Sequence, residues 1–323
     1  MIRQAAVIGA GLMGTGIARH LASQGADVIV ADSSPEQLVA AKAVPENQPL
    51  RFTKDLADLS DRDFVIEAVF EDLAVKRDLL ARVAEIVSAD CVIASNTSSL
   101  LIRDMSGAVT YPNRFIGVHY NNPADFNPVV EIIASAQSDE SIASAIHHWM
   151  NQAGKLAIRC ADTPCFILNR QSLPYINAAA RCLDIATPGQ IDEIATSKLG
   201  VGLGPFAVMN LVGLNVMAAA SRNLAVLGEG YAPAPQLQAQ REPWGISPGP
   251  ANKAVVSEVV KRLRGAMIFP GRDILEQGLC SRDDLHEICI QALGYEKSSA
   301  EWLEILTPGV RDELIRIYLD SCR

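Results

Sequence analysis

A histidine and a glutamate lie twelve residues apart in this chain, each within an apolar stretch. His119 follows the run Phe-Ile-Gly-Val over 115–118, and Glu131 lies in the run Val-Val-Glu-Ile-Ile over 129–133. Burying a carboxylate among apolar residues is costly unless it has a partner, and an imidazole on a neighbouring strand is the natural one. Glu131 would then fix the tautomer of His119 and stabilise its protonated form.

Such a pair supplies the chemistry that an alcohol oxidation needs. The imidazole accepts the hydroxyl proton while hydride leaves the carbon, and it returns the proton in the reverse direction. His119 also ends its predicted strand, where ligands bind in open α/β sheets. The alternative is a buried ion pair with a structural role. The other histidines fall on helical stretches outside any motif and are interpreted as structural or solvated: His20, His147, His148 and His286.

The sequence Gly-Ala-Gly-Leu-Met-Gly over 9–14 is typical of a dinucleotide-binding turn, because an apolar run precedes it and a helix-like stretch comes after it. Gly9 allows the tight turn, Gly11 lets the backbone approach a pyrophosphate, and Gly14 lets the helix pack closely on the sheet. The first helical residues, Leu12 and Met13, belong to a helix N-terminus whose unpaired N–H groups and partial positive charge face the phosphates.

Asp32 ends the next predicted strand and selects between the two nicotinamide dinucleotides. Its carboxylate can accept hydrogen bonds from the hydroxyls of an adenosine ribose, and it repels a 2′-phosphate. Ser33 and Ser34 come next, with no arginine. The sequence therefore predicts NAD rather than NADP as the cofactor. The alternative is a glycine-rich turn beside a solvated aspartate.

Short β-rich runs alternate with helical patterns in the first half of the chain, which is typical of parallel strands joined by crossover helices. The patterns predict strands over 5–8, 27–31, 64–68, 91–95, 115–118, 129–133 and 156–160. They predict helices over 13–24, 35–41, 75–86 and 139–154. We therefore expect an α/β fold whose N-terminal domain, 1–161, is of the Rossmann type, with a doubly wound, mostly parallel sheet.

The alternation ends at Asp162-Thr163-Pro164, and the rest of the chain has helical patterns, so that 162–323 is expected to be an all-α domain. One helix is predicted over 167–185, with Pro174 as a kink or a start point. Further helices are predicted over 190–198 and from about residue 254, and a Pro/Gly/Gln-rich loop over 227–250 separates them.

The helical half contains an internal similarity. The segment 181–200 resembles 272–294, which indicates one helical module used twice, over about 162–226 and about 252–323. Chance similarity between amphipathic helices is the alternative.

Composition excludes several classes of partner. The net charge of −9 argues against non-specific binding to nucleic acid or to an anionic membrane. The apolar runs are too short or too interrupted to span a bilayer, and the chain enters its first strand without a signal sequence, which predicts a cytoplasmic location. The seven cysteines have no CxxC spacing, so that we expect mostly buried thiols and no metal site.

Five segments occur in the order and spacing of the L-3-hydroxyacyl-CoA dehydrogenases, the 3-hydroxybutyryl-CoA dehydrogenase group: 9–18, 67–76, 96–100, 117–131 and 162–170. The chain resembles this family up to about residue 213, and its later repeat is similar to the duplicated C-terminal module of the multifunctional fatty-oxidation enzymes. The resemblance implies a Rossmann domain, a helical domain and catalysis in the cleft between them. It also implies NAD-dependent interconversion of a 3-hydroxyacyl thioester and its 3-oxoacyl form.

The resemblance also assigns roles to single residues. The family's catalytic histidine and orienting glutamate fall on His119 and Glu131. Its hydroxyl-binding serine falls on Ser98, and the asparagine that contacts substrate falls on Asn169; both can hydrogen-bond the substrate oxygen and stabilise developing charge. A turn serine and a helix-start asparagine are the alternatives. Three more residues match positions that line the cofactor and substrate cleft, although charged surface residues would look the same: Glu71, Lys76 and Asn96.

Two departures from the family pattern concern the binding of coenzyme A and the hinge at the start of the helical domain. The stretch between Asp32 and Leu56 is much shorter than in typical members, whose helical arm there helps to hold coenzyme A. Only a helix over 35–43 and a turn from Pro45 to Pro49 are expected, which makes a grip on the CoA adenine doubtful. Cys165 replaces a family glycine and is expected to shift the hinge slightly.

A third departure bears on the acyl group. Polar side chains come after His119 at Asn121, Asp125 and Asn127, and Pro128 stands where a lysine is usual. Leaving such groups unpaired beside an alkyl chain costs about 1–3 kcal/mol each. We therefore expect a small or polar acyl group, carried on CoA or on a carrier protein.

Two other functions remain open. One is a dehydrogenase of a free hydroxy acid, as in the gulonate and carnitine dehydrogenase relatives. The other is a catalytically silent, crystallin-like NAD-binding protein, against which the joint presence of Ser98, His119, Glu131 and Asn169 argues. Single-module members pair through their helical domains. A second module in the same chain could occupy that surface, so that a monomer or a differently built homodimer is expected.

Overall fold

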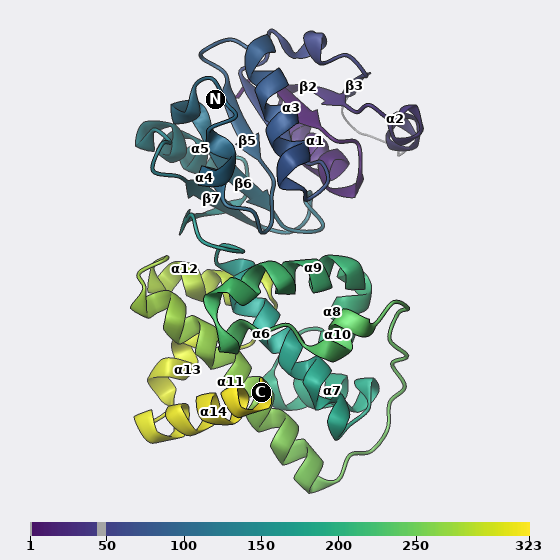
Figure 1. The fold of residues 1–323 in the computed structure, drawn as a ribbon, viewed down its shortest axis with the longest axis vertical. Helices are drawn as coiled ribbons and strands as arrows, with labels where there is room; N and C mark the ends of the chain where they lie inside the picture. Colours follow the sequence, from purple (N-terminus) through teal and green to yellow (C-terminus); the bar gives the residue numbers. More distant parts are fainter. Residues whose placement is uncertain (1, 44–49) are drawn as a thin grey trace. The chain divides into compact units, whose positions relative to one another are not determined.

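The computed structural model describes residues 2–43 and 50–323 (Figure 1). The predicted turn from Pro45 to Pro49 lies outside the described residues. The chain divides into two compact units, 1–163 and 164–323. None of the helices within the described ranges is both long and apolar enough to cross a membrane.

Unit 1 is built on an eight-stranded sheet in the order β3-β2-β1-β4-β5-β6-β7-β8. Neighbouring strands are parallel except β6 and β7, which are antiparallel. The strands are β1 (Gln4–Ile8), β2 (Asp27–Ala31), β3 (Leu50–Thr53), β4 (Phe64–Glu67), β5 (Val92–Ser95), β6 (Phe115–Tyr120), β7 (Val129–Ala134) and β8 (Leu156–Ala161). This doubly wound, mostly parallel sheet confirms the predicted α/β class.

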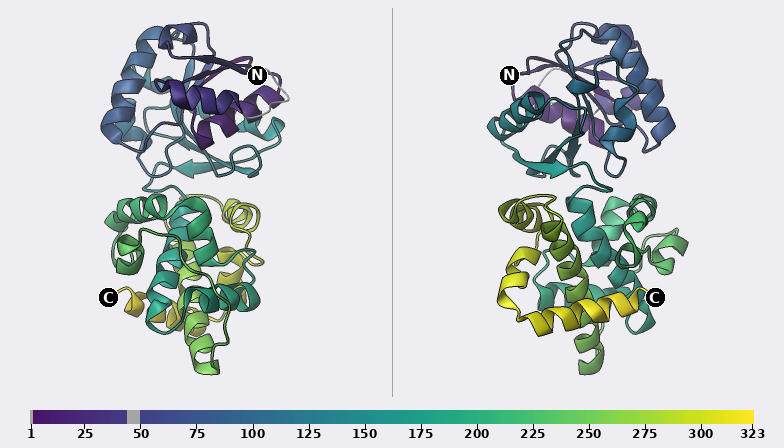
Figure 2. Two further views of the ribbon diagram at one scale, coloured as in Figure 1. Left: turned by 90° about the vertical axis from the view of Figure 1, so that its right-hand side faces the viewer. Right: turned by 60° about the vertical axis from the view of Figure 1, so that its left-hand side comes forward.

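Helices cover both faces of the sheet (Figure 2). They are α1 (Leu12–Ser23), α2 (Pro35–Lys42), α3 (Leu73–Ile86), α4 (Ile102–Ser106) and α5 (Glu140–Gln152), with single 3₁₀ turns at η1 (Leu56–Leu59) and η2 (Pro112–Arg114). Side-chain caps on Ser34, Asp72 and Asp139 begin α2, α3 and α5. The apolar faces of α1, α2 and α5 share one core with the sheet. The carboxyl ends of β1, β2 and β4 to β6 therefore meet along one edge.

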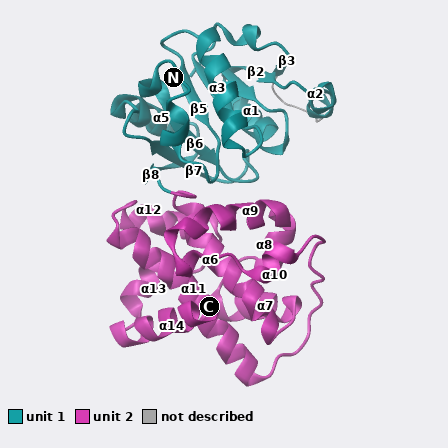
Figure 3. Cartoon of the chain, in the orientation of Figure 1, with its two compact units in different colours: residues 1–163 teal, residues 164–323 magenta. Residues whose placement is uncertain are grey.

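Unit 2, magenta in Figure 3, is entirely helical apart from one isolated bridge within the described residues. Its helices are α6 (Leu168–Arg181), α7 (Pro188–Ile194), α8 (Pro205–Val212), α9 (Leu214–Leu224), α10 (Pro235–Ala239), α11 (Lys253–Glu276), α12 (Arg282–Glu287), α13 (Ser299–Ile305) and α14 (Pro308–Ser321). Short turns lie at η3 (Cys182–Asp184), η5 (Ala225–Leu227) and η6 (Glu229–Tyr231). Nearly every side chain of α6 is buried, so that this helix is the centre of the unit.

The loop predicted over 227–250 is wrong in part, because it contains α10 and η6. Pro235 occupies the first turn of α10, where its missing N–H costs nothing. The preceding residue, Ala234, is buried and donates its N–H to Oδ1 of Asn177 in α6, 2.7 Å away. This tertiary contact holds a segment whose composition alone favours a loop.

The two similar segments of unit 2 also share a backbone pattern. Each continues a short helix into a π-turn, η4 (Ala195–Leu199) and η7 (Ile288–Ala292). A glycine in the left-handed region comes shortly after each, Gly200 with φ 67° and Gly294 with φ 66°. The two ends then meet, because Val201 pairs with Tyr295 in an antiparallel bridge. The similarity seen in the sequence is therefore also one of local structure.

Candidate active site

The pairing of β6 with β7 brings the predicted histidine and glutamate together. The register of these antiparallel strands places His119 directly opposite Glu131. The Nδ1 atom of His119 lies 2.6 Å from Oε2 of Glu131, and the two side chains are 6% and 0% exposed. An ionised carboxylate only accepts hydrogen bonds, so that Nδ1 carries the proton and Nε2 is the basic nitrogen of the ring. This is the geometry of an oriented general base.

Neighbouring residues fix the end of β6. Gly117 shares a face with His119, because side chains alternate along a strand. A Cβ on Gly117 would lie 2.8 Å from Cδ1 of Ile102, so that the glycine leaves room for α4. The N–H of Tyr120 donates to Oδ1 of Asn96, which comes directly after β5, over 2.8 Å. Asn96 therefore holds the strand next to the histidine.

Ser98 lies in a loop after β5 that is organised by Glu71. Oε1 of Glu71 accepts hydrogen bonds from the N–H of Ser98 at 2.9 Å and from its hydroxyl at 3.2 Å. Thr97 and Ser99 donate to the same oxygen. Burial alone would raise the pKa of Glu71, but Lys76 and these hydrogen bonds outweigh it and hold the pKa below its ordinary value. An ionised Glu71 thus positions the serine.

Lys76 lies beneath this loop rather than on its surface. Its side chain is 1% exposed, and Nζ lies 2.9 and 2.8 Å from the two carboxylate oxygens of Glu67. It also lies 3.4 Å from Glu71. Ser95 donates a further hydrogen bond to Glu67. In unit 1, Lys76 therefore acts on the loop electrostatically, through Glu71.

The turn after β1 fits a bound dinucleotide. Gly9 has φ 108°, and a Cβ there would lie 2.6 Å from the carbonyl oxygen of Ala68. A Cβ on Gly14 would collide with the carbonyl of Gly9, whereas no described atom lies within 4 Å of the Cβ position of Gly11. The first turn of α1 has no acidic residue, and Gly11, its N-cap, provides no side-chain cap. Its N–H groups suit a phosphate.

Three more residues around this turn are predicted to bind the cofactor. Leu12 is 74% exposed and Met13 is half-buried. Asp32 comes directly after β2 and accepts a hydrogen bond from the N–H of Ala10 at 2.7 Å and another from the N–H of Ser34 at 2.8 Å. Each carboxylate oxygen has a second lone pair, which leaves acceptor capacity for ribose hydroxyls. Asp32 thus links the glycine turn to the end of β2.

Asn169 belongs to unit 2, where it is half-buried in the first turn of α6. The two residues that lead into this helix, Cys165 and Phe166, have φ 61° and 52°. Cys165 therefore occupies the left-handed conformation that favours glycine, the residue usual at this place in the family. Its side chain is completely buried, and the thiol lies 3.6 Å from the carbonyl oxygen of Ala220.

The polar residues after His119 already have partners within unit 1. The expectation that they would leave unpaired polar groups beside the acyl chain is therefore wrong. The amide of Asn121 donates to the carbonyl of Val129 at 3.3 Å, and Oδ1 of Asn127 accepts from the N–H of the same residue at 3.1 Å. Asp125 forms an ion pair with Arg19 at 3.3 Å. These side chains organise the loop between β6 and β7, a role that sequence spacing did not indicate.

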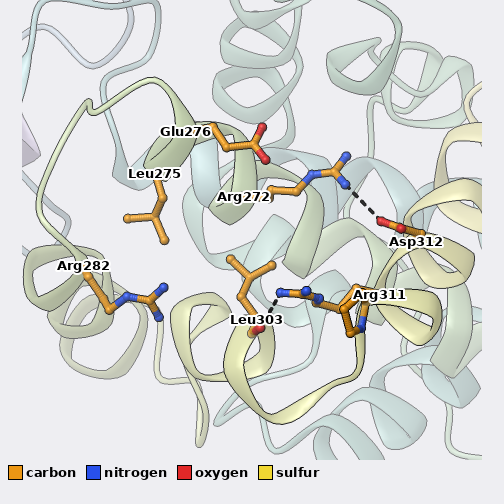
Figure 4. A pocket seen from close by; sticks show the side chains of 8 residues that line it. Arg272, Leu275, Glu276, Arg282, Leu303, Arg311 and Asp312 are labelled. Carbon is orange, nitrogen blue, oxygen red and sulfur yellow. Dashed lines mark hydrogen bonds and ion pairs between the residues drawn. The ribbon is translucent and has the colours of Figure 1, made fainter.

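A pocket of about 340 Å³ in unit 2 lies among charged side chains (Figure 4). Its walls come from residues 272 to 312, whereas the predicted site residues lie between 9 and 169. Arg272 faces Asp312 at 3.4 Å, and Arg311 donates to the carbonyl of Leu303 at 2.6 Å. The positive charges of this pocket are thus partly balanced by its own carboxylates.

Fold and dinucleotide turn together define an NAD-binding dehydrogenase of the Rossmann class. Comparison with known families makes the assignment specific. The model of the 3-hydroxyacyl-CoA dehydrogenase NAD binding domain matches residues 4–48 and 41–163, and that of the C-terminal domain of the same family matches 166–245. The chain belongs to the 3-hydroxyacyl-CoA dehydrogenase family.

Individual relatives agree with this family. A 3-hydroxybutyryl-CoA dehydrogenase of Mycobacterium tuberculosis is 35% identical over 240 residues, which cover 67% of this chain and 84% of the relative. The human mitochondrial hydroxyacyl-coenzyme A dehydrogenase is 31% identical, with 67% and 77% covered. The structure of 3-hydroxybutyryl-CoA dehydrogenase from Escherichia coli K12 has a TM-score of 0.84 at 21% identity and covers 100% of this chain and 96% of that one, which shows the same fold.

Proposed function

We propose that this protein interconverts a 3-hydroxyacyl thioester and its 3-oxoacyl form, with NAD as the redox partner. The observation that carries the proposal is the buried His119–Glu131 pair at the end of β6, with Nδ1 and Oε2 only 2.6 Å apart. The dinucleotide turn at the end of β1 lies at the carboxyl edge of the same sheet. The family and the names of its members support the substrate class.

In the oxidation, Nε2 of His119 accepts the proton of the 3-hydroxyl group. Bound NAD supplies the hydride acceptor. The imidazolium keeps its Nδ1–H bond to Glu131, whose charge offsets the new positive charge in a buried environment. In the reduction, the same nitrogen returns a proton to the carbonyl oxygen. Proton transfer of this kind contributes about 10²–10⁴-fold.

Two further residues are assigned to the substrate oxygen. The Ser98 hydroxyl, held by Glu71, donates to this oxygen as negative charge develops on it. The family's substrate-contacting asparagine falls on Asn169, in the first turn of α6. These roles are taken from the family pattern and from the places of both residues near the ends of their elements. Asp32 excludes a 2′-phosphate and so favours NAD over NADP.

A short acyl group suits the relatives, several of which are named 3-hydroxybutyryl-CoA dehydrogenase. Because Asn121, Asp125 and Asn127 already have partners, they no longer argue for a polar chain. The group that carries the acyl chain, CoA or a carrier protein, is a separate question. The connection from β2 to β3 holds one described helix, α2, of eight residues, and the family match breaks into two segments there. We propose that the nucleotide part of CoA adds little to binding.

The proposal is tested by following NADH oxidation with acetoacetyl-CoA, acetoacetyl-pantetheine, an acetoacetyl carrier protein and free acetoacetate. Turnover of the first two with similar kcat/KM is expected. A much higher kcat/KM with the acetoacetyl carrier protein would show that the acyl group is carried on that protein rather than on CoA. Turnover of acetoacetate alone would favour the free hydroxy acid dehydrogenase, the second candidate, which the short β2–β3 connection also permits. Inactivity with all four would contradict the proposal.

The assembly is proposed to be a monomer, with a homodimer built on another face as the alternative. Contacts between α6 and α11 within the chain support this proposal. The Arg170 guanidinium lies 2.5 Å from Asp273, and the amide of Gln171 donates to the carbonyl of Met267 at 2.9 Å. The second half of unit 2 thereby covers the central helix. The cytoplasmic location expected from the sequence stays a prediction.

A further inference from the structure

A third polar side chain touches the His119–Glu131 pair from the far side of the glutamate. Cys160 lies in β8, the strand that pairs with β7. Its Sγ atom lies 3.5 Å from Oε1 of Glu131, the oxygen opposite the one that faces His119. One carboxylate oxygen thus meets an N–H group and the other a thiol.

Strand register explains how three residues from three strands come to share this contact. Cys160 in β8 is aligned with Ile133 in the parallel strand β7. Ile133 lies two residues after Glu131 on that strand. Side chains two residues apart point to the same face of a strand, so that Cys160, Glu131 and His119 share one face of the sheet. Cys160 is 8% exposed, and this contact is therefore shielded from water.

The thiol has one proton, and two of the acceptors near it can be compared. Oε1 of Glu131 lies at 3.5 Å and the carbonyl oxygen of Ile158 at 3.7 Å. The carboxylate is charged and nearer, which makes it the stronger acceptor. A thiol is also a weak donor. It satisfies the second oxygen of Glu131 while leaving most of the negative charge for the imidazolium.

We propose that Cys160 is a positioning residue for the dehydrogenase: its thiol orients the Glu131 carboxylate and thereby His119. This inference rests on the proposed function. Loss of the thiol leaves a buried carboxylate oxygen without this donor, and the carboxylate then rotates away from its best geometry for His119.

Two variants separate this role from simple packing. Cys160→Val keeps a similar volume without a donor, and Cys160→Ser keeps a donor. We expect Cys160→Val to lower kcat about three- to tenfold with the KM for NAD unchanged, which corresponds to one weak hydrogen bond. We expect Cys160→Ser to restore part of this loss in kcat. Cys91→Val is the matched control, because Cys91 is a buried cysteine of the same unit whose thiol faces the carbonyl of Val92.

A second readout needs no turnover. An Nδ1–H proton in a short hydrogen bond to a carboxylate gives a downfield NMR signal. In the full chain, we expect the chemical shift of this His119 signal to change in Cys160→Val and to stay the same in Cys91→Val. Kinetics and signal equal to wild type in Cys160→Val would overturn the proposal, as would equal impairment of Cys160→Ser. If wild-type protein turns over no thioester, the proposed function fails, whereas the NMR comparison still tests the contact.

Discussion

At the scale of single residues, the proposed chemistry depends on the carboxylate of Glu131, which is shielded from water. Glu131 is completely buried, and its position between apolar neighbours is tolerable because His119 and Cys160 contact its two oxygens. Burying the carboxylate costs free energy when the imidazole is neutral. A protonated imidazole offsets part of this cost by its attraction to the carboxylate. The proposed function uses this difference for proton transfer.

Replacing Glu131 by glutamine therefore tests the charge while keeping the shape. We expect Glu131→Gln to lower kcat about 10²-fold, because the imidazolium loses its counter-charge and the ring loses its fixed tautomer. The Kd for NADH should stay within about twofold, by fluorescence titration, since unit 1 keeps its dinucleotide turn. Glu140→Gln, on the exposed face of α5, is the control. A fully active Glu131→Gln would exclude a role for the charge.

Asp32 offers a test of cofactor choice. Asp32→Asn keeps an acceptor for the N–H of Ala10 but removes the charge that repels a 2′-phosphate. The ratio of kcat/KM for NADH to that for NADPH should fall about tenfold, equivalent to about 1.4 kcal/mol. Glu36→Gln, nearby at the start of α2, should leave the ratio unchanged. An unaltered ratio in Asp32→Asn would show that selectivity lies elsewhere.

At the scale of elements, the site depends on loops that leave the sheet at one edge. The 97–99 loop is tied to Glu71, at the turn before α3, and α3 itself supplies Lys76 beneath it. The 121–128 loop is tied down by Lys155, whose ammonium donates to the carbonyls of Ala124 and Asn127 at 2.8 Å each. Hydrogen bonds to charged side chains, Glu71 and Lys155, thus hold both loops in place.

Glu71 makes the stability of its loop depend on pH. Its pKa is held below the ordinary value of 4.5, because Lys76 and the hydrogen bonds from the loop outweigh burial. A depressed pKa contributes stability that is present above about pH 4.5 and is lost as the pH falls through the folded-state pKa. At about pH 7, the urea concentration at the midpoint of unfolding should be higher for wild type than for Glu71→Gln. This difference should shrink below about pH 4.5. A constant difference from about pH 7 to about pH 3 would contradict this.

The sequence predicted the elements whose apolar runs are long and buried on both faces, and these include the strands that carry His119 and Glu131. It missed β3 and α4, because β3 is a short, partly exposed edge strand and α4 has only five residues, too few for a periodic pattern. The contacts of Asn121, Asn127 and Cys160 could not be read from spacing, since they depend on register and loop conformation.

At the scale of the whole molecule, buried polar contacts join the two halves of unit 2, although its segments resemble two modules. The side chain of Arg170 is 1% exposed and reaches from α6 to Asp273 in α11, and Tyr231 donates to the same carboxylate. Removing one partner of such a pair leaves a buried charge without its counter-ion. The two halves are therefore expected to unfold together.

Asp273→Ala should lower the free energy of unfolding by about 2–3 kcal/mol, in a single transition, because Arg170 loses its counter-ion. Urea unfolding monitored by circular dichroism measures this. Asp312→Ala, which removes an exposed partner of Arg272, is the matched control and should cost less than about 1 kcal/mol. Two separate transitions in Asp273→Ala, or no loss, would show that the halves are independent.

The central claim is that Nε2 of His119 moves the proton of the 3-hydroxyl group. Its most direct test compares wild type with His119→Ala in NADH oxidation by acetoacetyl-CoA, with the Kd for NADH measured on both proteins. We predict a loss of about 10²–10⁴-fold in kcat with NADH affinity unchanged. An unchanged rate in His119→Ala, with wild type active, would contradict the account.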